Sequence, residues 1–362
     1  MAAAESSLLL TAVTYQSINM SLLYRFTALP FLLLTGILPV RQGNNMKAEA
    51  RSVSPTVASR PAADSSHRPP VIQFKIDPIV STDSANCTIP FTRVGNLIVI
   101  QASVDGTEGN FILDTGAPKL ILNITYFRSY PSLSSSEEDA GGITGGMGGN
   151  SPTMVNKFSF GPVHYEQVEA DRINLGHIEN SKGIKILGLL GMQLFKKFEM
   201  ILDYEKSLIH LHLITKKEAS TYKNEMLADT SLYNEFPIDI MEDKLITYGE
   251  MAGKKLIFVI DTGAESNVLD SRLPNKVFEN VAITRRILLT GSGNRKVEAL
   301  YGDMKNMKMG KLDIASLPVL VTNLEKMCFS YNKCLDGMLG FDFLSMHKIG
   351  FNFVKRKMYI WK

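Results

Sequence analysis

The four residues Asp-Thr-Gly-Ala occur twice in this chain of 362 residues, each time directly after an apolar run. The first copy begins at Asp114 after Phe-Ile-Leu, and the second begins at Asp261 after Phe-Val-Ile. Upstream of each Asp the sequence holds another apolar run and then a short polar turn with glycine, over residues 96–109 and 244–255. Each copy therefore predicts a β-hairpin whose second strand ends at the Asp.

A second pair of similar segments follows the two hairpins. Residues 188–191 read Gly-Leu-Leu-Gly, and residues 337–340 read Gly-Met-Leu-Gly. These glycine blocks lie 149 residues apart, and the two Asp-Thr-Gly-Ala segments lie 147 residues apart. A nearly constant offset over two separate blocks indicates that the chain contains two copies of one unit. In each copy we expect a short helix after the glycine block, at 192–197 and 341–346, and then a strand.

The repeat predicts an N-terminal lobe at residues 71–213 and a C-terminal lobe at 235–362, joined by a polar linker at 214–234. Both lobes consist of short β-branched and apolar runs separated by turn residues, which is typical of mostly β structure. Apolar residues make up 45% of the chain and charged residues 21%, as in globular proteins. The net charge of +3 predicts no broad basic surface, so we expect no nucleic acid as a partner.

The first 50 residues resemble an export signal or an N-terminal anchor. An apolar run of 12 residues at 29–40 follows Arg25 and is short for a membrane span. The segment before Arg25 is long for a signal peptide, and a true start at Met20 would remove this difficulty. Residues 51–70 have the composition of a flexible linker. We therefore expect a secreted or periplasmic protein. An uncleaved membrane anchor and a cytosolic chain with a buried apolar N-terminus are the alternatives.

The cysteine and histidine residues predict neither a disulfide-built fold nor a metal site. The chain has three cysteines. Cys328 and Cys334 are close enough to pair around a small loop and would leave Cys87 over, but three ordinary thiols fit the sequence equally well. His210 and His212 alternate along one predicted strand without a third ligand at useful spacing, so we expect a surface pair on that strand.

An aspartate at the end of a buried apolar strand is costly unless its carboxyl group is hydrogen-bonded or shares a proton. Two units related by an approximate two-fold axis would place Asp114 and Asp261 side by side. Two carboxyl groups in contact share one proton and titrate as a pair. Such a pair can activate a water molecule against an amide carbonyl and protonate the leaving nitrogen. This chemistry needs no metal ion, cofactor or covalent intermediate.

These motifs resemble the pepsin and retropepsin clan of aspartic proteases, and most closely its bacterial two-lobed retropepsin-like members. The resemblance extends over about residues 90–362 and rests on the two Asp-Thr-Gly-Ala segments and the two glycine blocks. It implies two homologous β-barrel lobes related by a pseudo-two-fold axis, with a cleft between them. It also implies an aspartic-type endopeptidase, a hydrolase acting on a polypeptide in extended conformation, with both lobes of one monomer forming the site.

The same resemblance assigns roles to residues of both lobes. Asp114 and Asp261 would be the catalytic dyad, which is the established mechanism of that clan. The residues that would support the dyad are Thr115, Gly116, Thr262 and Gly263. Two glycine-rich segments would be flaps over the substrate, with Gly145, Gly146, Met147 and Gly148 in the first and Gly291, Ser292 and Gly293 in the second. Neither segment contains the Tyr of a pepsin-like flap, so two flaps as in retropepsin dimers fit better.

Two departures from the pepsin-like pattern affect the expected chemistry. Ala117 and Ala264 stand where those enzymes often have Ser or Thr. A hydroxyl there would stabilise the ionised carboxylate, so its absence predicts a less acidic dyad and an optimum at mildly acidic to neutral pH. The alternative function is an exported, non-catalytic peptide-binding protein on the same fold, because a duplicated lobe can lose turnover and keep its structure. Pairing of lobes between two molecules is an alternative assembly.

Overall fold

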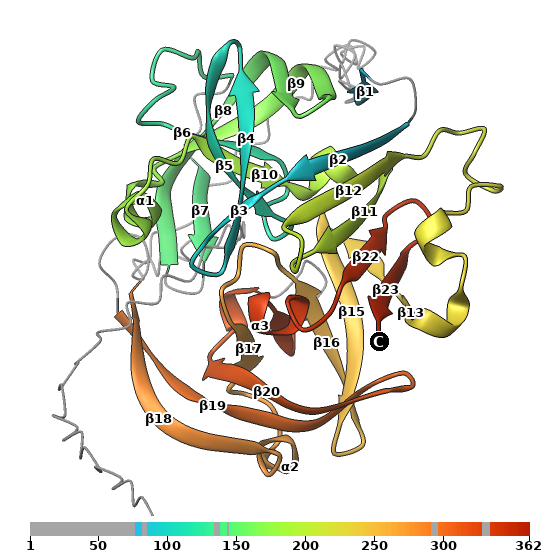
Figure 1. Cartoon of the computed structure of the whole chain (residues 1–362). Helices are drawn as coiled ribbons and strands as arrows, with labels where there is room; N and C mark the ends of the chain where they lie inside the picture. Colours follow the sequence, from blue (N-terminus) through green and yellow to red (C-terminus); the bar gives the residue numbers. More distant parts are fainter. Residues whose placement is uncertain (1–76, 82–84, 134–137, 143–144, 291–295, 328–333) are drawn as a thin grey trace, which may run out of the picture.

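The computed structural model describes residues 77–81, 85–133, 138–142, 145–290, 296–327 and 334–362. The predicted export segment and flexible linker lie outside the described residues. Figure 1 shows two strand-rich lobes, with the N-terminal lobe in the upper half of the view and the C-terminal lobe in the lower half. Within the described part of the chain, no helix is long and apolar enough to cross a membrane.

Six strands close into a barrel in the N-terminal lobe. The barrel closes because the long strand β8 pairs with both β4 and β9. In order around the barrel, the strands are β9 (Val163–Ile173), β6 (Leu120–Asn123), β10 (Gly188–Gly191), β5 (Thr107–Asp114), β4 (Leu97–Val104) and β8 (Gly145–Phe160). The elements beside the barrel are β1 (Ile79–Val80), β3 (Thr92–Val94), β7 (Glu138–Gly142) and α1 (Gly176–Lys182).

The C-terminal lobe repeats this barrel strand for strand, which confirms the predicted mostly β fold of two homologous lobes. Here β19 closes the ring by pairing with both β15 and β20. The strands are β20 (Leu312–Thr322), β17 (Asn267–Asp270), β21 (Gly337–Leu339), β16 (Lys254–Ile260), β15 (Lys244–Met251) and β19 (Lys296–Met309). The flanking elements are β14 (Asp239–Met241), β18 (Val281–Thr290), α2 (Asn275–Phe278), η5 (Glu325–Met327) and α3 (Phe341–Leu344).

A third sheet of six strands joins the two lobes. Its central pair, β11 and β22, comes from different lobes, and Met200 lies opposite Phe351, both fully buried. In order across the sheet, the strands are β13 (Tyr233–Pro237), β23 (Lys357–Trp361), β22 (Ile349–Asn352), β11 (Phe198–Asp203), β12 (Leu208–Leu213) and β2 (Asn86–Pro90). The segment between the lobes carries two short 3-10 turns, η2 (Glu225–Leu227) and η3 (Thr230–Leu232). Because β11 and β22 share backbone hydrogen bonds, the lobes are connected by more than this segment.

The segment after each glycine block differs from the expected short helix and single strand. The helix is one turn long in each lobe, as η1 (Met192–Phe195) and α3, and two antiparallel strands follow it. The turn between those strands is local. Lys206 N–H donates to the Asp203 carboxylate at 3.0 Å, and Ser207 has a positive φ of 55°. The prediction missed this turn because it contains no glycine or proline to mark it.

Close packing against the barrel core explains why the glycine blocks contain glycine. β10 runs parallel to β5 with Gly188 opposite Phe111, and β21 runs parallel to β16 with Gly337 opposite Phe258. A Cβ at Gly188 would lie 2.5 Å from the Phe111 ring, and one at Gly337 would lie 2.7 Å from the Phe258 ring. Both phenylalanines are fully buried, so only glycine lets the strands approach this closely.

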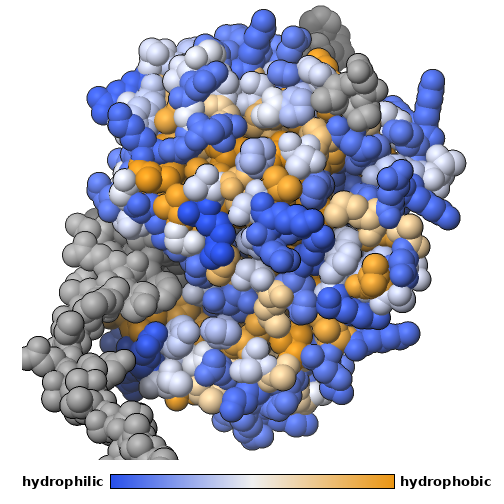
Figure 2. Space-filling view, viewed as in Figure 1, coloured by the Kyte–Doolittle hydropathy of each residue, from blue (hydrophilic) through white to orange (hydrophobic). Residues whose placement is uncertain are grey.

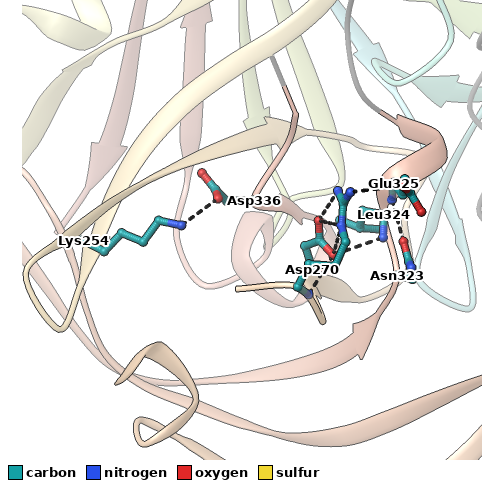
Figure 3. Close-up of polar contacts among 7 residues, drawn as sticks. Lys254, Asp270, Asn323, Leu324, Glu325 and Asp336 are labelled. Atoms are coloured by element: carbon teal, nitrogen blue, oxygen red, sulfur yellow. Dashed lines mark hydrogen bonds and ion pairs between the residues drawn. The ribbon is translucent and has the colours of Figure 1, made fainter. Parts of the chain in front are cut away.

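Polar contacts fix the strand ends beside the second glycine block. Asp270, at the end of β17, donates its backbone N–H to the carbonyl of Asp336 at 2.9 Å. Its carboxylate accepts from the N–H of Leu324 and from the Arg272 guanidinium, and Lys254 forms an ion pair with Asp336 at 3.4 Å (Figure 3). These contacts hold the block against the hairpin that ends at Asp261.

The surface and the cysteines complete the fold. Figure 2 shows a face that is mostly hydrophilic, with apolar patches scattered between polar side chains. Cys334 is disulfide-bonded, and Cys87 is a buried free thiol. Cys328, the partner that the sequence suggests for Cys334, lies outside the described residues.

Candidate active site

The two Asp-Thr-Gly-Ala segments meet at the interface between the lobes. Asp114 ends β5, and Asp261 directly follows β16. Their side chains are 3% and 1% exposed, and the two carboxyl groups are hydrogen-bonded to each other. The offset between the copies predicted this meeting, because equivalent strand ends approach one another across a pseudo-two-fold axis.

Backbone N–H groups of the following residues surround both carboxylates. Gly116 and Ala117 donate to Asp114 Oδ1 at 2.9 and 3.1 Å, and Gly263 donates to Asp261 Oδ1 at 2.8 Å. The glycines also make room for the carboxyl group of the opposite lobe. A Cβ at Gly116 would lie 2.6 Å from the Asp261 carboxylate, so any other residue at this position would push the two carboxyl groups apart.

Two threonines form hydrogen bonds between the lobes beside the carboxyl pair. Thr115 N–H donates to the Thr262 hydroxyl, and Thr262 N–H donates to the Thr115 hydroxyl, both at 3.0 Å. Each hydroxyl then donates to a carbonyl of the other lobe, Thr115 to Ile260 at 2.9 Å and Thr262 to Leu113 at 2.8 Å. All these groups are buried, so the geometry of the pair depends on both lobes.

A sequence model of the aspartyl protease family matches residues 100–194 and 247–343, which together make up more than half of the chain. The chain belongs to the aspartyl protease family. The match covers the two repeated regions separately, and each match contains one Asp-Thr-Gly-Ala segment and one glycine block. The family supports an aspartic protease function with a polypeptide substrate. No curated protein sequence matches the chain.

Burial raises the pKa of both aspartates of this aspartyl protease family member. For Asp114, burial raises the pKa, and hydrogen bonds from Asp261, Ala117 and Gly116 oppose this. For Asp261, burial is again the largest cause, and the nearby charge of Asp114 raises the pKa further. The two groups are best treated as one pair that keeps a shared proton to higher pH than a free carboxyl group would.

The predicted flap residues fall partly inside the described structure. Gly145, Gly146, Met147 and Gly148 form the first part of β8, where Gly142 pairs with Gly145 and Gly141 with Gly146. Gly291, Ser292 and Gly293 lie outside the described residues. The strands on either side of that segment, β18 and β19, pair with each other up to Thr290 and Lys296. The β7–β8 and β18–β19 hairpins therefore lie at equivalent places in the two barrels.

The structure adds residues at the lobe interface that the sequence reading did not single out. Glu265, which directly follows the second Asp-Thr-Gly-Ala segment, forms an ion pair with Lys182 at 2.5 Å, and their side chains are only 11% and 12% exposed. The carbonyl of Glu265 accepts from the Asn96 side chain at 3.0 Å. Lys182 and Asn96 belong to the N-terminal lobe, so both contacts cross the interface. The position of Glu265 beside the motif was the one signal in the sequence that could have marked it. Its partner, Lys182, lies 83 residues away and has no such signal.

Two further ionisable groups lie near the second Asp-Thr-Gly-Ala segment. Asp342, on α3, has a pKa raised to about 6 because of burial, and the charge of Glu265 contributes. Lys244, the first residue of β15, is 5% exposed. Hydrophobicity patterns do not reveal such residues, because both stand at the ends of elements rather than within an apolar stripe.

The two histidines of β12 lie in different environments. His212 is buried and stacks on Tyr222 with 3.7 Å between the ring centres, whereas His210 is partly exposed. The expectation of a surface pair is therefore wrong for His212. The polar segment between the lobes folds over this face of the sheet and supplies Tyr222, which the alternation of the strand alone does not indicate. Among the described residues, no three His, Cys, Asp or Glu side chains are placed to hold a metal ion.

Proposed function

We propose that this protein is an aspartic endopeptidase that hydrolyses internal peptide bonds with a water molecule activated by Asp114 and Asp261. The observation that supports it best is the buried, hydrogen-bonded pair of carboxyl groups, one from each lobe. A pair that shares one proton offers a base and an acid in a single site. The threonine contacts fix this pair before substrate binds, which limits the reorganisation needed during reaction.

The proposed reaction proceeds in two steps, each with two proton transfers. The ionised carboxyl group takes a proton from the water molecule while the water oxygen attacks the carbonyl carbon of the peptide bond. At the same time the protonated carboxyl group donates its proton to the carbonyl oxygen. The product is a tetrahedral gem-diol. The carboxyl group that gained a proton then protonates the amide nitrogen, and the other recovers its proton from a hydroxyl of the gem-diol as the C–N bond breaks. The pair returns to its starting state with one proton.

The substrate in this proposal is a polypeptide bound as an extended strand. Backbone hydrogen bonds supply much of the affinity in such complexes, and side-chain pockets supply selectivity. The flap segments at 145–148 and 291–293 would provide those backbone contacts. A monomer with one site is the proposed assembly, supported by the sheet in which β11 and β22 of the same chain pair.

An exported location is part of the proposal. The apolar run at 29–40 supports it, and so does the disulfide at Cys334, since disulfides persist in oxidising compartments. Cell fractionation with a C-terminal tag would test the location, and recovery of the tagged protein in the cytosol alone would contradict it.

The activity test is cleavage of a diverse pool of unstructured peptides by the purified protein, scanned across pH, with and without a statine-type inhibitor. The variants are Asp114→Asn and Asp261→Asn. Asp313→Asn is the matched control, because Asp313 lies on β20 with its side chain 78% exposed. The proposal predicts cleavage by the wild type and the control only. Peptide binding without cleavage by the wild type would favour the non-catalytic alternative.

A further inference from the structure

Lys244 stands directly beside Asp261 in the register of the second hairpin. The last pair of β15 and β16 on this side is Leu245 opposite Ile260, and continuing this register by one residue places Lys244 opposite Asp261, the residue that follows β16. Side chains at opposite positions of antiparallel strands point to the same face. Lys244 is 5% exposed and its charge interacts with that of Asp261, so its side chain lies inside the protein near the carboxyl pair.

The N-terminal lobe has an apolar residue at the equivalent place. The last pair of β4 and β5 on this side is Val99 opposite Ile112, and continuing this register by two residues places Leu97 opposite Asp114. Leu97 is 147 residues before Lys244, which is also the distance between the two aspartates. Leu97 is 1% exposed. The pair of carboxyl groups therefore has a buried leucine on one side and a buried lysine on the other.

The turn before Lys244 fixes its position from both lobes. Met241 and Lys244 close a two-residue hairpin turn, in which Glu242 and Asp243 have positive φ angles of 46° and 60°. Such turns set the register of the strands that follow. Asp243 also forms an ion pair with Lys196, which belongs to the N-terminal lobe. The lysine is thus held by the turn, by β16 and by a contact across the lobe interface.

The charges around Lys244 connect it to the dyad. Burial lowers the pKa of Lys244, while the carboxylates of Glu242 and Asp243 in the turn and of Asp261 on the facing strand raise it. Interaction between two charges acts equally on both partners, so Lys244 favours the ionised carboxylate of Asp261, against the larger effects of burial and of the Asp114 charge, which raise the pKa of Asp261. Asp114 lies next to Asp261 in that pair.

We propose that Lys244 is a positioning residue whose charge stabilises the ionised form of the Asp114–Asp261 pair and so sets the pH range of peptide hydrolysis. This inference rests on the proposed function. The pair lacks the hydroxyl donors of pepsin-like motifs, since Ala117 and Ala264 occupy those places. A buried cation on one side offsets part of that loss. The charge of Lys244 lowers both pH limits of the active, singly protonated pair. The lower limit is the pH at which the pair takes up a second proton, and the upper limit is the pH at which it loses its only proton.

The test compares the pH dependence of kcat/KM for Lys244→Met, Lys244→Arg and Leu97→Met. Methionine keeps the length of the side chain and removes the charge, arginine keeps the charge, and Leu97→Met is the neutral control in the other lobe. Loss of the charge raises both limbs of the profile of Lys244→Met by on the order of one pH unit. Lys244→Arg and Leu97→Met keep the wild-type limbs. A structural role alone would change the height of the profile and leave both limbs in place.

Thermal melts establish that each variant is folded, and Lys244→Gln replaces Lys244→Met if the latter does not fold. Unmoved limbs in the uncharged variant, or equal shifts in the arginine and methionine variants, would overturn the inference. Asp114→Asn and Asp261→Asn run in parallel. Their inactivity together with unmoved limbs in Lys244→Met overturns the role of Lys244 alone, whereas cleavage that survives both Asp substitutions overturns the proposed function and this inference with it.

Discussion

Thr115 and Thr262 each donate a backbone N–H to the hydroxyl group of the other, at 3.0 Å in both directions. Each hydroxyl also donates across the interface to a carbonyl, of Ile260 or of Leu113. Four buried hydrogen bonds therefore cross between the lobes immediately beside the two carboxyl groups. Neither lobe can complete this arrangement alone, so stability of the lobe interface and alignment of the pair are linked.

Substitution Thr115→Val should destabilise the protein, because it keeps the shape and removes the hydroxyl. The N–H of Thr262 and the carbonyl of Ile260 would lose their partners in a buried place. We expect the free energy of unfolding to fall by about 2–4 kcal/mol, since each buried group left unsatisfied costs about 1–3 kcal/mol. Denaturant unfolding measures this, with Thr115→Ser as the control that retains the hydroxyl. Equal stability of the Val and Ser variants would contradict the linkage.

The ion pair of Lys182 and Glu265 should contribute more than an exposed pair, because both side chains are largely buried. Glu265→Gln leaves the lysine charge without its partner, and we expect a loss of about 2–4 kcal/mol in the free energy of unfolding. The control is Asp313→Asn, which breaks an exposed pair with Lys308 and should cost less than about 0.5 kcal/mol. Similar losses for the two variants would show that the buried pair does not hold the lobes.

Asp342 should make the protein less stable as the pH rises. Burial raises its pKa from the ordinary value of 3.8 to about 6, so the folded protein prefers the protonated carboxyl group. This preference contributes fully below pH 3.8 and is lost as the pH rises through about 6. Asp342→Asn cannot ionise, so its melting temperature relative to that of the wild type should rise as the pH increases from about 4 to about 7. A constant difference across that range would contradict the assignment.

The pH optimum of peptide cleavage should lie at mildly acidic to neutral pH. Activity requires one proton on the carboxyl pair, and burial raises the pKa of both Asp114 and Asp261. The doubly protonated, inactive form therefore persists to higher pH than for free carboxyl groups, and the singly protonated form persists toward neutral pH. A pH profile of kcat/KM measures this directly. A peak below about pH 3, under the pKa of an ordinary Asp, would exclude it.

The sequence predicted the parts of the fold that depend on local pattern and on the repeat. The hairpins ending at Asp114 and Asp261 follow from short turns between apolar strands, and the repeat then predicts two like lobes. The sheet that joins the lobes was not predicted. Glu199 of β11 and Asn352 of β22 lie 153 residues apart, and no local signal marks such a pairing. The contact between Lys182 and Glu265 was not predicted for the same reason, because this ion pair exists only when the two lobes are in contact.

The double-substitution experiment on the carboxyl pair tests the central claim most directly. If Asp114 and Asp261 act as one unit, each single change to Asn should lower the rate constant of the cleavage step by at least about 1000-fold, and the double change should cost no more than the worse single change. The measurement is single-turnover cleavage of one peptide by the wild type and the three variants. Cleavage that persists in either single variant, or losses that multiply in the double variant, would contradict a shared dyad.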